Sequence, residues 1–438
     1  MPIERIDHCY DSHVHWLATG EMQSRLDLRS LKKAEDVASL LVLPQHFKDR
    51  WLIGFGWDES LWSSPDGLNR KTLDRQFPDH PVCFSRVDGH TVWLNSKALE
   101  ELGWLRGDLP QFQGGKIIMD DTNTPTGIAI DSAANFVRKQ IPKANATQVA
   151  ASLLQAVRVF NNQGITHIRD MTCSIEQWSE AVRLDDSGLL TLAVEQFFSA
   201  DDPADFDDAF ELALQARKTT TPRLRAKGLK VYYDGALGSE GAFLSQDYPS
   251  GSGRGLVLIE PSELKQMLRR SWEQKFDIAV HTIGDQAAQD VVEVACQLWD
   301  KGFKGHLHLE HAQVLRPETV SLLVGKTVTC HLQPSHWLSD KRWLKEKLGS
   351  LYEFSFPWRQ LQEAEIEFYF GSDSPIEPAD IPRSLSALND SALHGIPKLL
   401  GPGLKYHTHP DPTWVPGTFS EFSNDQVKAV VFQGKHLF

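Results

Sequence analysis

The chain has 438 residues, of which 41% are hydrophobic and 24% are charged, and its formal net charge is −13. This composition is typical of a globular protein, and the acidic balance argues against nucleic acid or an anionic membrane as the main partner, because both select a basic surface. No apolar run approaches the ~18 residues of a membrane span, and the opening residues MPIERIDHCYDSH lack the apolar core of a signal peptide.

The cysteines favour a reducing compartment. There are five, they lie far apart, and no Cys-x-x-Cys is present, which argues against a zinc ribbon or a redox motif. A cytoplasmic protein with mostly buried thiols fits this pattern. The sequence leaves a homo-oligomer open. The residues are Cys9, Cys83, Cys173, Cys296 and Cys330.

Eight short apolar runs along the chain are typical of buried parallel strands, and segments with helical periodicity lie between most of them. Strands that alternate with helices indicate a parallel sheet, and eight such units close into a (β/α)₈ TIM barrel, so the predicted fold class is α/β. In chain order the runs are IDHCYDSHVHW (6–16), GITHIRDM (164–171), LLTLAVEQFF (189–198), GLKVYYDGAL (228–237), FDIAVHTIGD (276–285), HLHLEHAQ (306–313), KTVTCHLQP (326–334) and IEFYFGSDSP (366–375).

One long region interrupts this alternation. Residues 17–150 separate the first strand from the second, and they contain strand-like WLIGFGWDE and PVCFSRVDGH together with a hairpin-like segment. We predict an inserted α/β subdomain that shapes the substrate pocket, because loops at the carboxyl face of a barrel do so. The barrel then comprises residues 1–16 and 151–400. Residues 401–438 form a tail with one strand, QVKAVVFQGK.

The stretch DSHVHW carries His13 and His15 two residues apart. On a strand both side chains point the same way, so they can hold one metal ion. The pair alone is weak evidence, because the histidine-rich chain has two further His-x-His pairs, His306/His308 and His407/His409.

Polar residues also mark the ends of other strands. Lys230, His281, His311 and Asp373 each have an ordinary alternative as a salt-bridge partner, a structural histidine or a turn-capping aspartate. Together with the histidine pair, however, they form a set of donors suited to a divalent metal. In HLHLEHAQ two faces compete, and we expect the apolar face that ends in His311, and not the face of His308, to point into the barrel.

These motifs resemble the amidohydrolase superfamily, in the branch that includes N-substituted formamide deformylase-like enzymes. The resemblance covers about residues 10–378. It is carried by DSHVHW, GFGWDE, VDGHTVWLNSKAL, PTGIAID, GITHIRD, LKVYYDGALGS, VHTIGDQA, LEHAQ and GSDSPIEP.

The resemblance implies a metal-bearing (β/α)₈ barrel that holds one or two divalent ions, with zinc the first choice. It also implies that the lysine is carbamylated in related enzymes, which would turn a buried cation into a bridging carboxylate. Relatives carry a flanking β-sandwich that is largely absent here, and they often have Arg where this chain has Glu240. The implied ligands are His13, His15, Lys230, His281, His311 and Asp373.

The predicted function is a metal-dependent hydrolase that cleaves an amide or similar C–N bond of a small molecule with a metal-activated hydroxide. Asp373 is the predicted proton shuttle, and His90 in VDGHTVW is a candidate catalytic residue that contacts the substrate. The alternatives are an ester or lactone hydrolase on the same site, or a non-catalytic barrel kept for binding.

Overall fold

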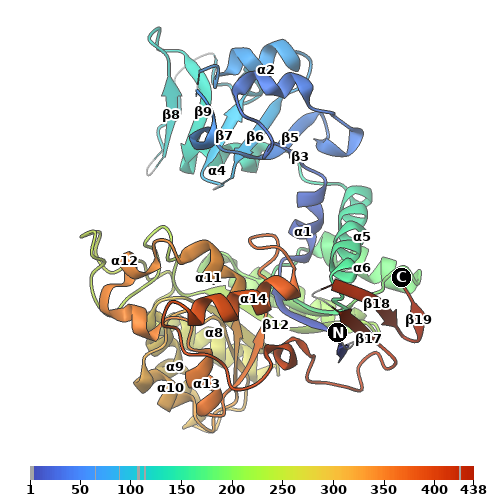
Figure 1. Ribbon diagram of the computed structural model, residues 1–438, viewed down its shortest axis with the longest axis vertical. Coiled ribbons are helices and arrows are strands. Elements are labelled where there is room, and N and C mark those ends of the chain that lie inside the picture. Colours follow the sequence, from blue (N-terminus) through green and yellow to red (C-terminus); the bar gives the residue numbers. More distant parts are fainter. Residues whose placement is uncertain (1–3, 65, 88, 106–108, 113–114, 424–425) are drawn as a thin grey trace. The chain divides into compact units, whose positions relative to one another are not determined.

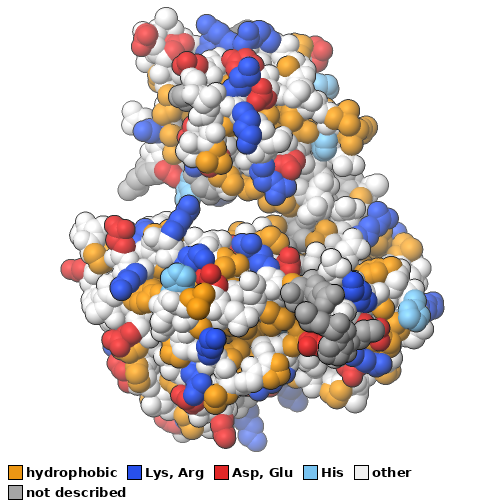
Figure 2. All heavy atoms as spheres, viewed as in Figure 1, with side chains coloured by type: hydrophobic (Ala, Val, Ile, Leu, Met, Phe, Trp, Pro, Cys, Tyr) orange, Lys and Arg blue, Asp and Glu red, His pale blue; other side chains and the backbone are white. Residues whose placement is uncertain are grey.

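The computed structural model describes residues 4–64, 66–87, 89–105, 109–112, 115–423 and 426–438. The chain divides into two compact units, one formed by residues 1–20 and 150–438 and the other by residues 21–149 (Figure 1). No helix among the described residues is both long and apolar enough to cross a bilayer. On the face of the molecule in Figure 2, basic and acidic side chains are interspersed over both units.

The larger unit contains eight parallel strands in the order β16-β15-β14-β13-β12-β11-β10-β2. A parallel bridge between Val14 and Ser374, where His15 N donates to Ser374 O at 2.8 Å, joins the two ends of this sheet. The predicted α/β barrel is therefore confirmed. The strands are β2 (Tyr10–Val14), β10 (His167–Asp170), β11 (Ala193–Ser199), β12 (Leu224–Tyr232), β13 (Asp277–Thr282), β14 (Leu307–His311), β15 (Val328–Leu332) and β16 (Glu367–Phe370).

Amphipathic helices cover the outside of the barrel. In α8 (Pro261–Glu273), proline occupies the first turn, and the buried residues recur at three- and four-residue spacing from Leu264 to Trp272. This spacing places one apolar stripe against the sheet. The other helices of this unit are α1 (Trp16–Gln23), α5 (Ala146–Asn162), α6 (Ile175–Asp186), α7 (Phe206–Ala216), α9 (Asp285–Trp299), α10 (Pro317–Leu323), α11 (Pro334–Asp340), α12 (Leu344–Leu348), α13 (Trp358–Glu363) and α14 (Ile381–Ala392), of which α1 and α5 cross the unit boundaries.

The carboxyl-terminal tail forms more structure than the sequence predicts. Instead of one strand it contributes β17 (Phe419–Ser423), β18 (Gln426–Phe432) and β19 (Lys435–His436), and β17 pairs antiparallel with β1 (Glu4–Asp7). The strands nearest the two ends of the chain thus meet in one four-stranded sheet (Figure 1). The prediction of a one-strand tail is wrong because β17, FSEFS, mixes phenylalanines with polar residues and β19 has only two residues, so their pairing leaves little local signal.

The inserted unit is built on a second sheet, in the order β3-β5-β6-β7-β9-β8, with β4 paired to β5. Alternate residues of its strands enter two separate apolar clusters, for example Leu52 and Phe84 in one and Ile53 and Cys83 in the other. Both faces of this sheet are therefore covered. Its elements are β3 (Leu26–Asp27), β4 (Phe47–Lys48), β5 (Trp51–Trp57), β6 (Val82–Arg86), β7 (Thr91–Leu94), β8 (Gly115–Met119), β9 (Pro125–Asp131), α2 (Arg70–Gln76), α3 (Ser96–Glu101) and α4 (Ser132–Gln140).

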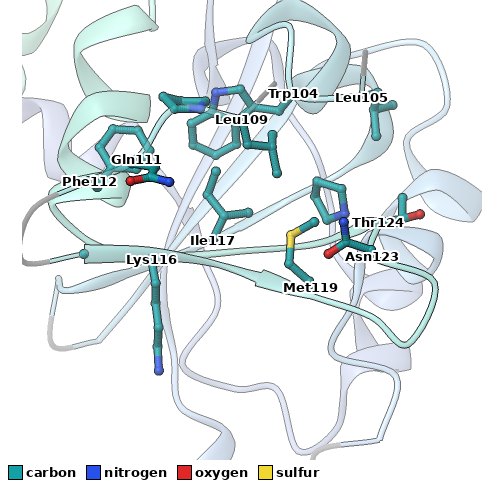
Figure 3. Close-up of a pocket in the computed structure, with 13 residues that line it drawn as sticks. Trp104, Leu105, Leu109, Gln111, Phe112, Lys116, Ile117, Met119, Asn123 and Thr124 are labelled. Carbon is teal, nitrogen blue, oxygen red and sulfur yellow. The ribbon is translucent and has the colours of Figure 1, made fainter. Parts of the chain in front are cut away.

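A cavity of about 650 Å³ lies within the inserted unit beside β8 (Figure 3). Its lining is mixed, with apolar side chains such as Trp104, Phe112 and Ile117 and polar ones such as Gln111 and Asn123. The role of this unit in shaping a substrate pocket stays a prediction.

Candidate metal centre

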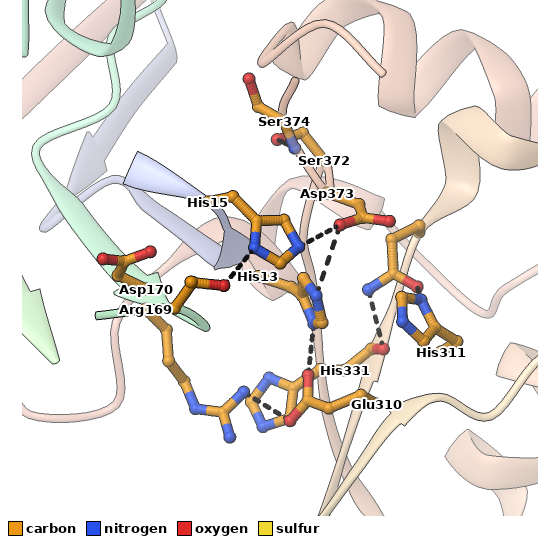
Figure 4. Close-up of polar contacts among 12 residues, drawn as sticks. His13, His15, Arg169, Asp170, Glu310, His311, His331, Ser372, Asp373 and Ser374 are labelled. Atoms are coloured by element: carbon orange, nitrogen blue, oxygen red, sulfur yellow. Dashed lines mark hydrogen bonds and ion pairs between the residues drawn. The ribbon is translucent and has the colours of Figure 1, made fainter. Parts of the chain in front are cut away.

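Three of the predicted donors meet at the carboxyl end of the barrel. His13 lies on β2, His15 follows it directly, and Asp373 follows β16 by three residues. Oδ1 of Asp373 lies 3.4 Å from His13 Nε2 and 3.2 Å from His15 Nε2 (Figure 4). Because β2 and β16 close the barrel, residues at opposite ends of the chain share one site.

Local backbone features bring these two segments together. A Cβ on Gly371 would lie 2.6 Å from the backbone nitrogen of His13, so only glycine allows this close approach. Asp373 has a φ of +61°, a left-handed conformation that aspartate tolerates better than most residues. Its backbone N–H donates to His13 O at 2.8 Å, which fixes the carboxylate above the histidine pair.

Hydrogen bonds on the far side of the rings orient the histidines. Nδ1 of His13 lies 2.5 Å from Glu310 Oε2, and Nδ1 of His311 lies 2.8 Å from Gln333 Oε1. The Gln333 amide donates to His331 O, so its oxygen faces His311. In the neutral rings Nδ1 therefore carries the proton, which leaves Nε2 of each ring with a free lone pair, as a metal ligand requires.

The atoms that face the site have no hydrogen-bond partner among the described residues. Buried and unpaired are Nε2 of His13, His281 and His336, together with Oδ1 of Asp373. Each such atom costs about 1–3 kcal/mol in a native structure. The unpaired atoms of His13 and His336 both belong to donor groups that include Asp373, which indicates a missing ligand.

The distances between these donor atoms also fit ligands of one metal ion better than direct hydrogen bonds. Two ligands of one zinc ion, each bonded at about 2.0–2.2 Å in tetrahedral geometry, lie about 3.4 Å apart. The separations of 3.2 and 3.4 Å at Asp373 Oδ1 match this value, whereas charge-assisted hydrogen bonds are about 2.7–2.9 Å long. The residues present therefore fit a divalent ion.

The prediction that the apolar face of β14 points into the barrel is wrong. Glu310 contacts Arg169 on β10 and His13 on β2, and the ring of His308 lies 5.5 Å from Phe197 on β11. None of these strands is adjacent to β14, so the face of His308 and Glu310 points into the barrel. His311 reaches the site by another route, because it has a φ of +68° that breaks the strand alternation. Its ring lies 4.7 Å from that of His13.

Lys230 lies on β12, and His281 lies on the neighbouring strand β13. The ring of His281 lies 4.5 Å from that of His311. Burial and the charge of Lys230 lower the pKa of His281 to about 3. His281 is thus neutral and able to bind a cation. The Lys230 ammonium lies 4.2 Å over the Tyr232 ring, and burial lowers its pKa to about 8, although Glu310 and Asp373 act in the opposite direction.

A buried ion pair between Arg169 and Glu310 lies next to His13. Arg169 Nη1 lies 2.7 Å from Glu310 Oε1, and both side chains are almost completely buried (Figure 4). Burial alone would raise the pKa of Glu310, but Arg169, His331 and His13 hold it well below its ordinary value. The Glu310 carboxylate therefore stays charged and accepts a hydrogen bond from His13 Nδ1. Burial would likewise raise the pKa of Asp373, but His13 and His15 hold it well below its ordinary range.

Sequence reasoning missed Glu310, Arg169 and His336. The first two stand inside otherwise apolar strand runs, where a charge must find a partner, and that signal could have found them. His336 lies on α11, outside the strands, with its Nε2 3.5 Å from Asp373 Oδ2. His90 belongs to the inserted unit, where its Nδ1 lies 2.9 Å from Asp131 Oδ1, and its catalytic role stays a proposal.

Comparison with known proteins decides the family, because the model of the amidohydrolase family matches residues 10–403. The chain belongs to the amidohydrolase family. This membership confirms the predicted superfamily and supports hydrolase activity.

Among the relatives of this amidohydrolase is YtcJ of Bacillus subtilis (strain 168), which is named as an amidohydrolase. It is 30% identical over 382 residues, which cover 84% of this chain and 70% of YtcJ. The N-substituted formamide deformylase of Arthrobacter pascens is 21% identical over 299 residues, or 65% of this chain and 54% of that protein.

A solved structure with a similar fold is an uncharacterized metal-dependent hydrolase of Pyrococcus horikoshii OT3. It has a TM-score of 0.73 and 25% identity, and the alignment covers 90% of this amidohydrolase and 76% of that chain. The metal dependence of this similar structure is consistent with the groups of metal donors described above.

Proposed function

We propose that this amidohydrolase cleaves an amide or similar C–N bond of a small molecule with the help of one or two divalent ions. The observation that carries the proposal is the set of unpaired buried donors around Asp373. Nitrogen and oxygen donors in this combination favour zinc. The proposed ligands are His13, His15, Lys230, His281, His311 and Asp373.

A divalent ion held by these residues supplies a Lewis acid that activates water and polarises a carbonyl. Asp373 is the proposed shuttle, because its carboxylate is ionised and can accept the proton of the attacking water. It then passes that proton to the leaving amine. His90 is proposed to contact the substrate.

We also propose Lys230 as the position of a carbamate. Its amine is buried beside Glu310 and Asp373, and with a pKa of about 8 a fraction of it is neutral and nucleophilic at neutral pH. Addition of CO₂ would exchange a buried cation for a carboxylate that can bind metal.

A substrate panel tests the proposed function. Zinc-loaded protein is incubated with N-acyl amines, N-substituted formamides, esters and lactones, and a chelated sample is the control. We expect turnover of amides or formamides that chelation abolishes and zinc restores. Turnover of esters or lactones alone would favour the alternative hydrolase. Loaded protein that cleaves none of these bonds would contradict the proposal.

A further inference from the structure

Another group of metal donors lies at the amino end of the barrel, opposite the metal centre. Asp277 begins β13, His306 directly precedes β14, and His308 is the second residue of β14. His281 of the centre lies four residues further along β13, roughly 13 Å away at the rise of an extended strand. The group therefore shares no residue with the ligands of the proposed function.

The donor atoms of this group converge. One side-chain atom from each of Asp277, His306 and His308 lies within 4.8 Å of the other two. Nε2 of His308 lies 3.3 Å from Asp277 Oδ2. This gap is longer than a charge-assisted hydrogen bond of about 2.7–2.9 Å and close to the ~3.4 Å between two ligands of one tetrahedral zinc ion. The two histidine rings are stacked, with centroids 4.2 Å apart and an interplanar angle of 11°, so each restricts the other.

Hydrogen bonds behind His306 decide which of its nitrogens can bind a cation. Thr329 Oγ1 donates to Glu367 Oε2 at 2.7 Å, so this hydroxyl has no proton left for His306. Nε2 of His306 lies 2.8 Å from the same hydroxyl oxygen and is therefore the donor. Burial lowers the pKa of His306, which favours the neutral ring. In that ring Nδ1 keeps a free lone pair, as a metal ligand requires.

His308 is also neutral, because burial and the charge of Arg169 hold its pKa well below its ordinary value. Its Nδ1 lies 2.9 Å from His331 Nε2. The tautomer that donates from His308 Nδ1 to His331 leaves a lone pair on Nε2, the nitrogen that faces the Asp277 carboxylate. Both histidines can thus offer nitrogen to one cation beside this carboxylate.

The ammonium of Lys227 competes for the same carboxylate. Lys227 Nζ lies 3.1 Å from Asp277 Oδ2, and the lysine side chain is 39% exposed. Burial would lower the pKa of Lys227, but Glu195 and Asp277 hold it above its ordinary value, so the ammonium stays charged. A metal ion has to displace Lys227 from Asp277. The exposure of the lysine allows this movement, and Glu195 remains as its partner.

We propose that Asp277, His306 and His308 form a separate zinc site at the amino end of the barrel, which takes up the ion in exchange for the ammonium of Lys227. Two imidazole nitrogens and one carboxylate oxygen suit Zn²⁺, with water completing the shell. Because Lys227 competes, the site binds more weakly than the metal centre and empties when free zinc is removed. A bound ion joins β13 to β14 and stabilises the folded chain.

The test is a zinc titration of the whole protein after desalting, so that only tightly held ions are present at the start. Uptake of added Zn²⁺ is measured by competition with a chromophoric chelator, and the melting temperature is followed in parallel. His306→Phe keeps a ring that can stack on His308 but removes both nitrogens. Asp277→Asn removes the negative charge, and Lys227→Met removes the competing ammonium.

Two matched controls accompany these variants. His394→Phe changes a histidine outside the donor groups, and Asp300→Asn changes an aspartate that likewise pairs with a lysine, Lys326, at 3.6 Å. Neither control should alter zinc uptake.

We expect the wild type and both controls to bind one additional zinc ion per chain and to melt at a higher temperature with it. His306→Phe and Asp277→Asn should bind this ion at least about 10-fold more weakly, because even residues behind a metal ligand change affinity by that much. Lys227→Met should bind it at least about 2-fold more tightly, as loss of a partly exposed ion pair allows.

The site would be overturned by a wild type that binds no additional ion, or by unchanged binding in His306→Phe and Asp277→Asn. Unchanged or weaker binding in Lys227→Met would overturn the exchange with the ammonium. Protein that holds no tight zinc but takes up the additional ion would instead contradict the proposed function and leave this site intact.

Discussion

Asp373→Asn is expected to lower kcat by about 10²–10⁴-fold, the usual cost of a lost general base. Asparagine keeps the shape of the side chain and can still offer an oxygen to a metal, but it cannot take up a proton. Oδ1 of Asp373 has no hydrogen-bond partner in the described structure, and its backbone bond to His13 O remains. We therefore expect the melting temperature to change little.

The control for this variant is Asp380→Asn. Asp380 caps α14 by accepting from Arg383 N at 2.9 Å, and asparagine caps a helix equally well. Turnover, zinc content and melting temperature are measured on both variants with a substrate from the panel. Near wild-type turnover of fully loaded Asp373→Asn would remove Asp373 from proton transfer, and His90 would be the next residue to test.

Glu310→Gln should weaken zinc binding about 10–100-fold, as loss of a residue that orients a metal ligand does. Glu310 accepts from His13 Nδ1 at 2.5 Å and pairs with Arg169 at 2.7 Å, with all three side chains buried. A glutamine amide that faced His13 would donate to Nδ1, and the ring proton would move to Nε2. That proton would occupy the lone pair needed for the metal.

The same substitution leaves the guanidinium of Arg169 buried without its counter-charge. Removal of one partner of a buried pair costs about 3–5 kcal/mol in the free energy of unfolding. Adding Arg169→Met removes both charges and should recover stability but not zinc affinity. This double variant keeps the test valid where the single variant folds poorly.

Glu367→Gln is the matched control, because Glu367 accepts from Thr329 Oγ1 at 2.7 Å and is exposed on β16. Zinc affinity measured by chelator competition should equal that of the wild type in this control. Wild-type affinity in the variants of Glu310 would show that His13 needs no carboxylate to orient it.

The barrel could be predicted from sequence because buried parallel strands appear as short apolar runs. In β13, for instance, Ile278, Ala279 and Val280 are all buried, and the polar residue that follows them, His281, marks the carboxyl end. The pairing of β1 with β17 could not be predicted, since it joins segments some 400 residues apart and neither strand has a strong apolar pattern.

The site was harder to predict in its details. The rule that apolar residues face inward failed at β14, because helices cover the outside of this barrel while a charged pair, Arg169 and Glu310, fills part of its interior. The left-handed φ of His311 is a feature of the folded backbone, and no residue spacing indicates it. The approach of His336 to Asp373 depends on how α11 packs, which the sequence alone does not reveal.

The most direct test of the account is the metal content of protein purified without exposure to chelator. Elemental analysis should find one or two divalent ions per chain, mainly zinc. His13→Ala with His15→Ala should lower this content, since both remove ligands that face Asp373 Oδ1. A wild-type content well below one ion per chain would contradict the conclusion that these converging donors form a metal centre.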